Sequence, residues 1–138
     1  PRWSADGQSL VFTSVRANNA ATWEILRLAP ESGEVTALTD NTVKDWGAAF
    51  APDGSLIYLT EGEGYAAVMR MDADGGNART LYDGDGYEWG LSYSPDGDLI
   101  TFTADTSGRD EIYLMNAGGG DVRAVTELGG MSANWMPQ

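Results

Sequence analysis

The sequence contains no cysteine and no histidine. Without cysteine there is no disulfide, no thiolate metal site and no cysteine nucleophile. Without histidine, a Ser-His-Asp triad and every histidine-containing metal site are excluded as well. The chain also lacks a G-x-S-x-G elbow and a P-loop, which removes two further catalytic signatures. Paired carboxylates are what remains for catalysis, and we expect a protein that is not an enzyme.

Basic residues are scarce too. Eight lysines and arginines stand against 21 acidic residues, which gives a net charge of −13. Phosphate binding needs a positive patch, so we expect no nucleic acid as a partner and no anionic membrane surface. No apolar run approaches the length that spans a bilayer, so we expect no membrane insertion. We interpret the acidity as a means of staying in solution, with a preference for cationic partners as the alternative.

What the sequence does contain is a repeated turn. In its most complete form, at 91–97, an aromatic residue ends a short run and Ser-Pro-Asp-Gly follows. Proline presets the first turn position, aspartate binds nearby backbone groups and glycine accepts a positive φ, so each copy predicts a tight reversal between strands. Copies lie at 1–7, 48–54, 91–97 and, truncated, at 133–138, and their aromatic residues Trp3, Phe50, Tyr93 and Trp135 are 47, 43 and 42 residues apart. A period in the forties is typical of β-propeller blades.

Each unit contains four short runs of β-branched and aromatic residues. Gly, Asn and Asp bound these runs, and none is long enough to form a stable helix. The sequence therefore predicts an all-β fold made of three four-stranded antiparallel sheets, each a propeller blade. We place blade 1 at about 1–45, blade 2 at about 46–88 and blade 3 at about 89–130, with 131–138 as an extra inner strand.

The repeats resemble one known family. Trp3-Ser4-Ala5-Asp6-Gly7, the turn at 94–97 and the stretch 111–119 are similar to the blades of TolB-like, WD-repeat-like propellers. The pairs Leu38-Thr39 and Val125-Thr126 resemble the element that ends each blade there. The resemblance implies a propeller that holds partners, as in the periplasmic protein that binds lipoproteins and toxins, or that gates prolyl-oligopeptidase-like enzymes. It also implies a periplasmic or extracytoplasmic location.

Three blades predict an unfinished ring, because propellers usually close with four to eight. The apolar outer faces of blades 1 and 3 would be exposed on a monomer. We therefore expect a homodimer that closes a six-bladed ring, six being the blade number that the resemblance implies. The C-terminal copy around Trp135 is expected to pair with the first blade of the partner. The alternative is an excised or designed propeller fragment with no ligand of its own.

A binding surface is expected on the face that carries the longer connections. The stereotyped turns share one face of a propeller, whereas the connections that differ between units share the other, and variable loops on a rigid scaffold usually carry recognition. We expect a peptide, a protein or a small polar ligand to bind there. Its aromatic anchors are Trp23, Tyr65 and Tyr87, and the same face carries Lys44 and Glu61.

Two tryptophans occupy equivalent positions in successive units. Trp46 and Trp89 each lie four residues before the aromatic residue of the repeated turn, and an acidic residue, Asp45 or Glu88, precedes each of them. In one interpretation all four belong to the binding surface, with the carboxylates at the mouth of the central channel. In the other, the tryptophans pack between neighbouring blades as core, and the carboxylates are ordinary charges at the channel rim.

Calcium is the ion that an acidic chain without histidine favours, since it prefers oxygen ligands. The acidic loop with Asp83 and Asp85 is a weak candidate site, because the other ligands of a twelve-residue calcium loop are missing. We expect no other cofactor. A calcium-binding or carboxylate-only hydrolase that uses Asp83, Asp85, Asp45 and Glu88 stays as the catalytic alternative.

Overall fold

The computed structural model describes residues 1–16, 19–62, 65–106 and 108–136, apart from the side chains of 16 and 19–21. Within these ranges the regular elements are twelve β-strands. The first four are β1 (Arg2–Trp3), β2 (Leu10–Arg16), β3 (Asn19–Ala29) and β4 (Glu34–Ala37). The next four are β5 (Asp45–Phe50), β6 (Leu56–Glu61), β7 (Ala66–Met71) and β8 (Arg79–Asp83). The last four are β9 (Tyr87–Tyr93), β10 (Leu99–Asp105), β11 (Asp110–Asn116) and β12 (Arg123–Ala124).

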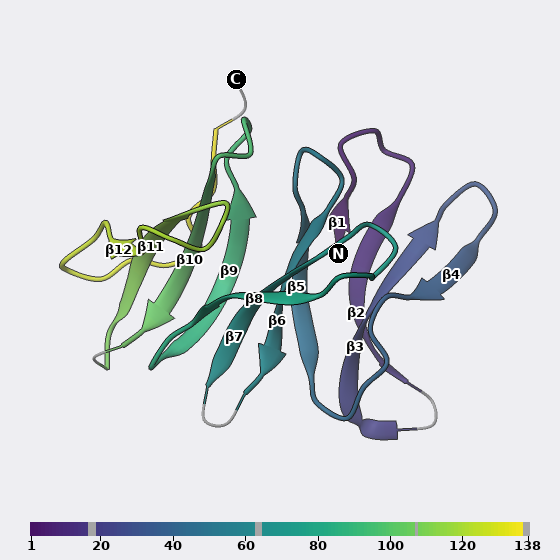
Figure 1. Ribbon diagram of the computed structural model, residues 1–138, viewed down its shortest axis with the longest axis horizontal. Helices are drawn as coiled ribbons and strands as arrows, with labels where there is room; N and C mark the ends of the chain where they lie inside the picture. The colour runs from purple at the N-terminus through teal and green to yellow at the C-terminus, as the bar shows by residue number, and fades with distance from the viewer. Residues whose placement is uncertain (17–18, 63–64, 107, 137–138) are drawn as a thin grey trace.

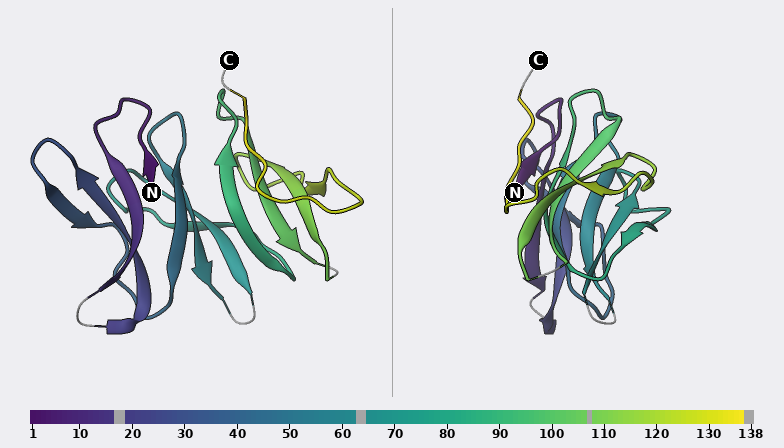
Figure 2. Two further views of the ribbon diagram at one scale, coloured as in Figure 1. Left: turned by 180° about the vertical axis from the view of Figure 1, so that it is seen from behind. Right: turned by 90° about the vertical axis from the view of Figure 1, so that its left-hand side faces the viewer.

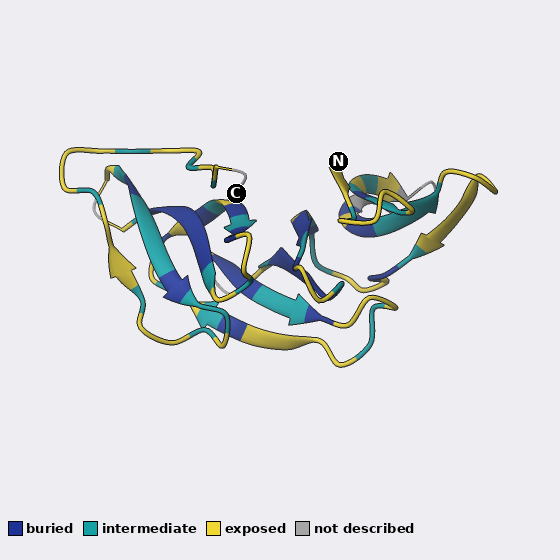
Figure 3. Ribbon diagram, turned by 90° about the horizontal axis from the view of Figure 1, so that it is seen from above, coloured by how far each residue is buried: buried dark blue, intermediate teal, exposed yellow. Residues whose placement is uncertain are grey.

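The twelve strands form three separate sheets of four, each an antiparallel meander in chain order. The sheets stand side by side (Figures 1 and 2), and from above they follow an open arc (Figure 3). This confirms the predicted all-β fold of three four-stranded blades. The second and third sheets begin at Asp45 and Tyr87, so the divisions drawn after 45 and 88 fall inside β5 and β9. No helix long and apolar enough to cross a membrane occurs in the described ranges.

The hydrophobic core lies between the blades. One cluster joins blades 1 and 2 and contains Val11, Ile25, Leu56 and Met71, which are all essentially inaccessible to solvent. The other joins blades 2 and 3, and Phe102 is its largest fully buried side chain. Stacked sheets bury alternate residues of each strand against the neighbouring sheet. The contacts between blades therefore bury most of the apolar side chains that form the core.

A buried carboxylate fastens the third strand to the end of the blade in two of the three units. In blade 1, Glu24 accepts hydrogen bonds from the Thr39 hydroxyl at 2.7 Å and from the backbone N–H of Asn41 at 3.4 Å. In blade 3, Glu111 accepts hydrogen bonds from the Thr126 hydroxyl and from the Gly129 N–H. Blade 2 replaces both partners, with Ala67 and Tyr82 at the corresponding positions.

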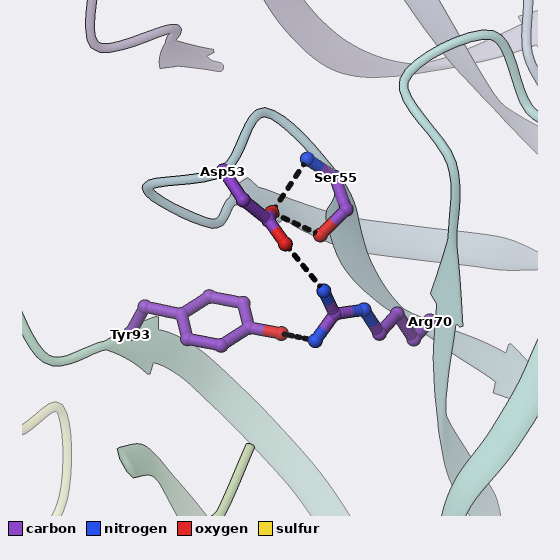
Figure 4. A network of polar contacts seen from close by, with 4 residues as sticks. All are labelled: Asp53, Ser55, Arg70 and Tyr93. Carbon is purple, nitrogen blue, oxygen red and sulfur yellow. Dashed lines mark hydrogen bonds and ion pairs between the residues drawn. The ribbon is translucent and has the colours of Figure 1, made fainter. Parts of the chain in front are cut away.

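The repeated turns connect the first and second strands and lie at the upper edge of Figure 1. In blade 2 the turn also joins two blades (Figure 4). Arg70 donates a hydrogen bond to Asp53 of the turn at 2.7 Å and another to the Tyr93 hydroxyl of blade 3 at 3.3 Å. Asp53 also accepts from the Ser55 hydroxyl and N–H, and these hydrogen bonds lower its pKa, helped by Arg70. Polar contacts thus join blades 2 and 3 on the face that carries these turns.

The C-terminal segment passes beside the last blade. The Ser132 N–H donates to the Thr103 hydroxyl at 3.2 Å, and the Trp135 indole donates to the Ser92 carbonyl at 3.4 Å. Up to 136 this segment has no strand assignment, and 137–138 lie outside the described residues. Over 131–136 the predicted inner strand is therefore not formed in a single chain, and the strand at 131–138 stays a prediction about the assembled ring.

Candidate functional site

Four aromatic side chains from three blades gather beside the variable connections. They belong to Trp23 on β3, Trp46 on β5, Tyr65 just before β7 and Tyr87 on β9. Trp23 and Trp46 meet edge to face with ring centroids 6.1 Å apart, and Tyr65 and Tyr87 do the same at 5.7 Å. Both distances fall in the favourable range for aromatic pairs. The strand ends that carry these residues lie at the lower edge of Figure 1, opposite the repeated turns.

These rings line a groove that we call the aromatic groove. It has a volume of about 280 Å³ and is formed by Trp23, Lys44, Trp46, Glu61, Gly62, Tyr65, Ala66 and Tyr87. Trp23 and Trp46 also line an adjoining hollow of about 390 Å³ beside Val15. Two other hollows, along the inner strands and beside the repeated turns, each contain a single aromatic residue. The aromatic groove is therefore where rings converge.

A β-bulge sets the position of Trp46 in this groove. The pairing of β5 with β6 shifts register between Trp46 and Ala49, and Gly47 takes a φ of 70°. A side chain at Gly47 would come within 3.3 Å of the Leu59 side chain, so both the conformation and the space favour glycine. The inner strand of blade 3 carries the same device, with Gly90 after Trp89 and a register shift in its pairing with β10.

One ion pair forms the polar part of the groove. The Lys44 ammonium is 2.9 Å from Glu61 Oε1 and 5.8 Å from the centroid of the Trp23 ring. The hydrogen bond from Lys44, reinforced by its charge, lowers the pKa of Glu61. The sequence placed both residues on this face but did not count them among the binding residues, because their contact joins segments that are 17 positions apart.

The predicted anchors are accessible to a partner. Trp23, Tyr65 and Tyr87 are 41%, 46% and 57% exposed, and all three line the groove. The two equivalent tryptophans have different surroundings. Trp46 is half-buried and contributes both to the core and to the groove, whereas Trp89 packs against the core and is not among the groove-lining residues.

The predicted place of the two carboxylates needs correction. Asp45 and Glu88 do not lie exposed at the channel rim; they are 0% and 1% exposed. Consecutive side chains of a strand point to opposite faces of the sheet. The tryptophan after each carboxylate therefore points to one face, and the carboxylate points to the other face and is buried between two sheets. Asp45 Oδ2 accepts from the Asn41 amide at 2.7 Å. Asp45 Oδ1 and both oxygens of Glu88 have no hydrogen-bond partner among the described residues.

Burial changes the acid–base behaviour of groups near these carboxylates. It raises the pKa of Glu88 to about 7, with a further contribution from the nearby charge of Asp83. It also raises the pKa of Tyr58 to about 12, where the charge of Asp45 adds to the effect. The pKa of Tyr82 rises through burial and the charge of Glu88. Glu88 is thus a desolvated acid whose charge acts on Tyr82, and it does not line the groove.

The acidic loop after β8 is open to solvent, and Asp83 and Asp85 are both exposed. Across the part of the chain that the structure describes, no group of three or more acidic side chains is arranged to hold a metal ion.

Comparison with known proteins gives one family. The family model described as the TolB beta propeller domain matches residues 1–138. Among solved structures, a putative TolB from Agrobacterium tumefaciens has a TM-score of 0.86 and 24% identity over 97% of this chain and 52% of its own. TolB from Acinetobacter baumannii has a TM-score of 0.80 and 23% identity over 95% of this chain and 32% of its own. A puromycin hydrolase has a TM-score of 0.75 and 20% identity over 92% of this chain and 21% of its own.

No curated protein sequence matches the chain. The chain spans about half of the Agrobacterium structure and about a third of the Acinetobacter one. At these identities the similarity shows the fold, which the chain shares with the two TolB structures and with part of the puromycin hydrolase.

Proposed function

The chain belongs to the family of TolB β-propeller domains, and on this basis we propose that it is a non-catalytic scaffold that binds a partner in the aromatic groove and closes into a ring with a second copy. The observation that supports binding most strongly is the convergence of four aromatic rings from three blades in one groove. Partly exposed tryptophan and tyrosine side chains are the usual anchors of protein interfaces.

The carboxylate-only hydrolase is less well supported. Its buried acids, Asp45 and Glu88, are closed off from solvent and do not line the groove, so a substrate bound there would not meet them. Asp83 and Asp85 lie on an exposed loop and do not line the groove either. The binding role, in contrast, depends on Trp23, Tyr65 and Tyr87, which are accessible to solvent.

Selection of peptides from a display library tests the binding role. We expect the intact protein to enrich peptides that bind the Trp23→Ser/Tyr65→Ser double variant at least about thirtyfold more weakly, the loss typical of an interface hot spot. Trp3→Ser is the matched control, because Trp3 is an exposed aromatic residue outside the groove. If no peptides are enriched, or if the double variant binds them as well as the intact protein does, the groove is not the binding site.

Support for ring closure comes from apolar surface at both ends of the arc. Val11 turns toward blade 2, which leaves Leu10 and Phe12 on the free face of blade 1. At the other end, Leu128, Met131 and Met136 are 92%, 62% and 84% exposed. Surface of this kind favours coverage by another subunit. A second copy would cover both apolar ends, since the third blade of each chain then meets the first blade of the other.

Strand exchange would complete the first blade. β1 comprises only Arg2 and Trp3, both exposed, whereas β5 and β9 have 6 and 7 residues. The segment Ala133–Met136 repeats the inner-strand pattern and already lies beside β9 through the Trp135 hydrogen bond. We propose that it pairs with β2 of the partner and displaces or extends the short β1.

The ring makes a prediction about mass. We expect native mass spectrometry at micromolar concentration to report twice the chain mass of 14.7 kDa. A chain that ends at Gly130 should dimerise more weakly, because it lacks the exchanged strand. A stable monomer would contradict the ring, and a truncated chain that dimerises as tightly as the full chain would contradict the exchange.

A further inference from the structure

The aromatic groove carries information about the chemistry of its ligand. We propose, building on the binding role above, that it is a site for an organic ammonium group, and that Lys44 is a tethered cation that competes for the same place. The argument rests on the arrangement of the rings, on the position of Lys44 and on the charge of the molecule.

The relative orientation of the aromatic rings favours a rounded ligand over a flat one. In each pair the ring planes are nearly perpendicular, at 90° for Trp23–Trp46 and 88° for Tyr65–Tyr87. Because the planes within each pair are perpendicular, the two rings of a pair do not form one flat platform. A nucleobase or a sugar ring stacks best on a flat platform, whereas a roughly spherical ammonium group is stabilised by faces on several sides.

The groove already accommodates a cation. The Lys44 ammonium lies 5.8 Å from the centroid of the Trp23 ring, which is within cation–π range, and contacts Glu61 at 2.9 Å. A π face and a carboxylate thus act together on one positive charge. Their side-chain exposure, 38% for Lys44 and 47% for Glu61, leaves both accessible, so a ligand cation can take the place of Lys44.

Charge complementarity favours the same class of ligand. The chain has a net charge of −13, and Lys44 is the only basic residue that lines the groove in the described part of the chain. Long-range attraction therefore raises the local concentration of cations and disfavours anions. A trialkylammonium group suits the groove better than a primary ammonium, since it is less strongly hydrated and covers more aromatic surface.

Two ligands that differ in one charge test the proposal. Choline and its neutral isostere 3,3-dimethylbutan-1-ol have the same shape, and binding is followed through the indole N–H resonances of the five tryptophans. We expect choline to shift the Trp23 and Trp46 resonances and to bind about tenfold more tightly than the alcohol, the gain expected from cation–π contacts. Trp3, Trp89 and Trp135 serve as internal controls.

The source of the ammonium group is decided by a parallel titration. A blocked tripeptide with a central trimethyllysine carries the same group on a peptide. Tighter binding of the peptide than of choline would assign the site to a protein side chain, and the reverse order would assign it to a small metabolite. Either order supports an ammonium site.

Lys44 gives the proposal a second, independent readout. Lys44→Met removes the competing cation and frees both Trp23 and Glu61, so we expect choline to bind at least about threefold more tightly. Arg123→Met is the matched control: it changes the net charge equally at an exposed position on β12 and should leave the affinity nearly unchanged. Equal effects of the two variants would reduce the role of Lys44 to its contribution to overall charge.

Two results would overturn the inference. If the alcohol binds as tightly as choline, the groove is an apolar site and the charge is irrelevant, although the binding role still stands on the selected peptides. If neither compound shifts the Trp23 and Trp46 resonances, the groove is not an ammonium site. Enriched peptides that lose affinity in the double variant would then still support a groove with another specificity.

Discussion

With Glu88 in place, the protein should lose stability as the pH rises from about 4.5 to 7, and the Glu88→Gln variant should not. Burial raises the pKa of Glu88 from its ordinary value of 4.5 to about 7 in the folded chain, so the folded state binds a proton more tightly than the unfolded state. The contribution of Glu88 to the free energy of unfolding is then highest below pH 4.5 and falls as the pH rises toward 7. The fall is about 3 kcal/mol, and above pH 7 this group changes the stability little.

Glutamine stays neutral, so the Glu88→Gln variant should lack this decline and be about 1–2 kcal/mol more stable than the natural protein at pH 8. The gain is smaller than the decline because the amide is itself a buried polar group. Urea unfolding at pH 4.5 and at pH 8 measures both quantities. Glu34→Gln is the control, because Glu34 is exposed on β4 and its variant should keep the decline. If the free energy of unfolding of the Glu88→Gln variant falls as much between pH 4.5 and pH 8 as that of the unsubstituted protein, Glu88 is stabilised in its charged form by a polar partner or by water.

Gly119→Ala should destabilise the fold by about 3 kcal/mol or more. Gly119 has a φ of 93° in the turn between β11 and β12, and a methyl group there would overlap the backbone carbonyl of Leu81 in blade 2. Gly75 makes the corresponding approach to Leu38 in blade 1, where the added carbon would be 2.5 Å from the carbonyl oxygen. These turns allow each blade to approach the one before it, so the alanine variant should separate blades 2 and 3.

Gly54→Ala provides the matched control. Gly54 also has a positive φ, of 86°, but nothing lies within 4 Å of an added carbon. Its alanine variant should lose only about 1 kcal/mol, the cost of the backbone conformation. Chemical denaturation of the two variants under one condition isolates the contact between blades. Similar losses for the two would show that the turn at Gly119 moves away from Leu81 at little cost.

The fold could be predicted because its determinants are local and repeated. Aspartate and glycine in the three complete copies of the turn close a reversal without help from distant residues, as the Ser94–Asp96 hydrogen bond at 2.5 Å and the φ of 80° at Gly97 illustrate. Short runs of β-branched residues then become strands because a neighbouring blade covers one face of blades 1 and 3 and both faces of blade 2. Few other arrangements satisfy that pattern.

The site was only partly predictable because it depends on contacts between blades. The location of Trp23, Tyr65 and Tyr87 on one face followed from the order of the strands, and all three line the groove. The different surroundings of Trp46 and Trp89, which share a sequence position, follow from what the neighbouring blade places beside each. Trp46 meets Trp23 of blade 1, whereas blade 2 has Ala66 at the position that corresponds to Trp23.

The burial of Glu88 also depends on distant parts of the chain. Its neighbour across the sheet is Ala104 of β10, a small residue with no group to pair with a carboxylate. In the sequence, an acidic residue next to a tryptophan in an acidic protein is typical of an exposed rim. Only the packing of blade 3 on blade 2 shows that this side chain is enclosed, and it is the enclosure that links Glu88 to stability.

The central claim, that partners bind in the aromatic groove, is tested most directly by a crystal structure of the protein with the tightest peptide from the library selection. We predict that a peptide side chain lies between the Trp23–Trp46 pair and the Tyr65–Tyr87 pair, with Glu61 on its polar side. A peptide seated instead along the inner strands or on the Pro-Asp-Gly turns, with the groove left open, would contradict the claim.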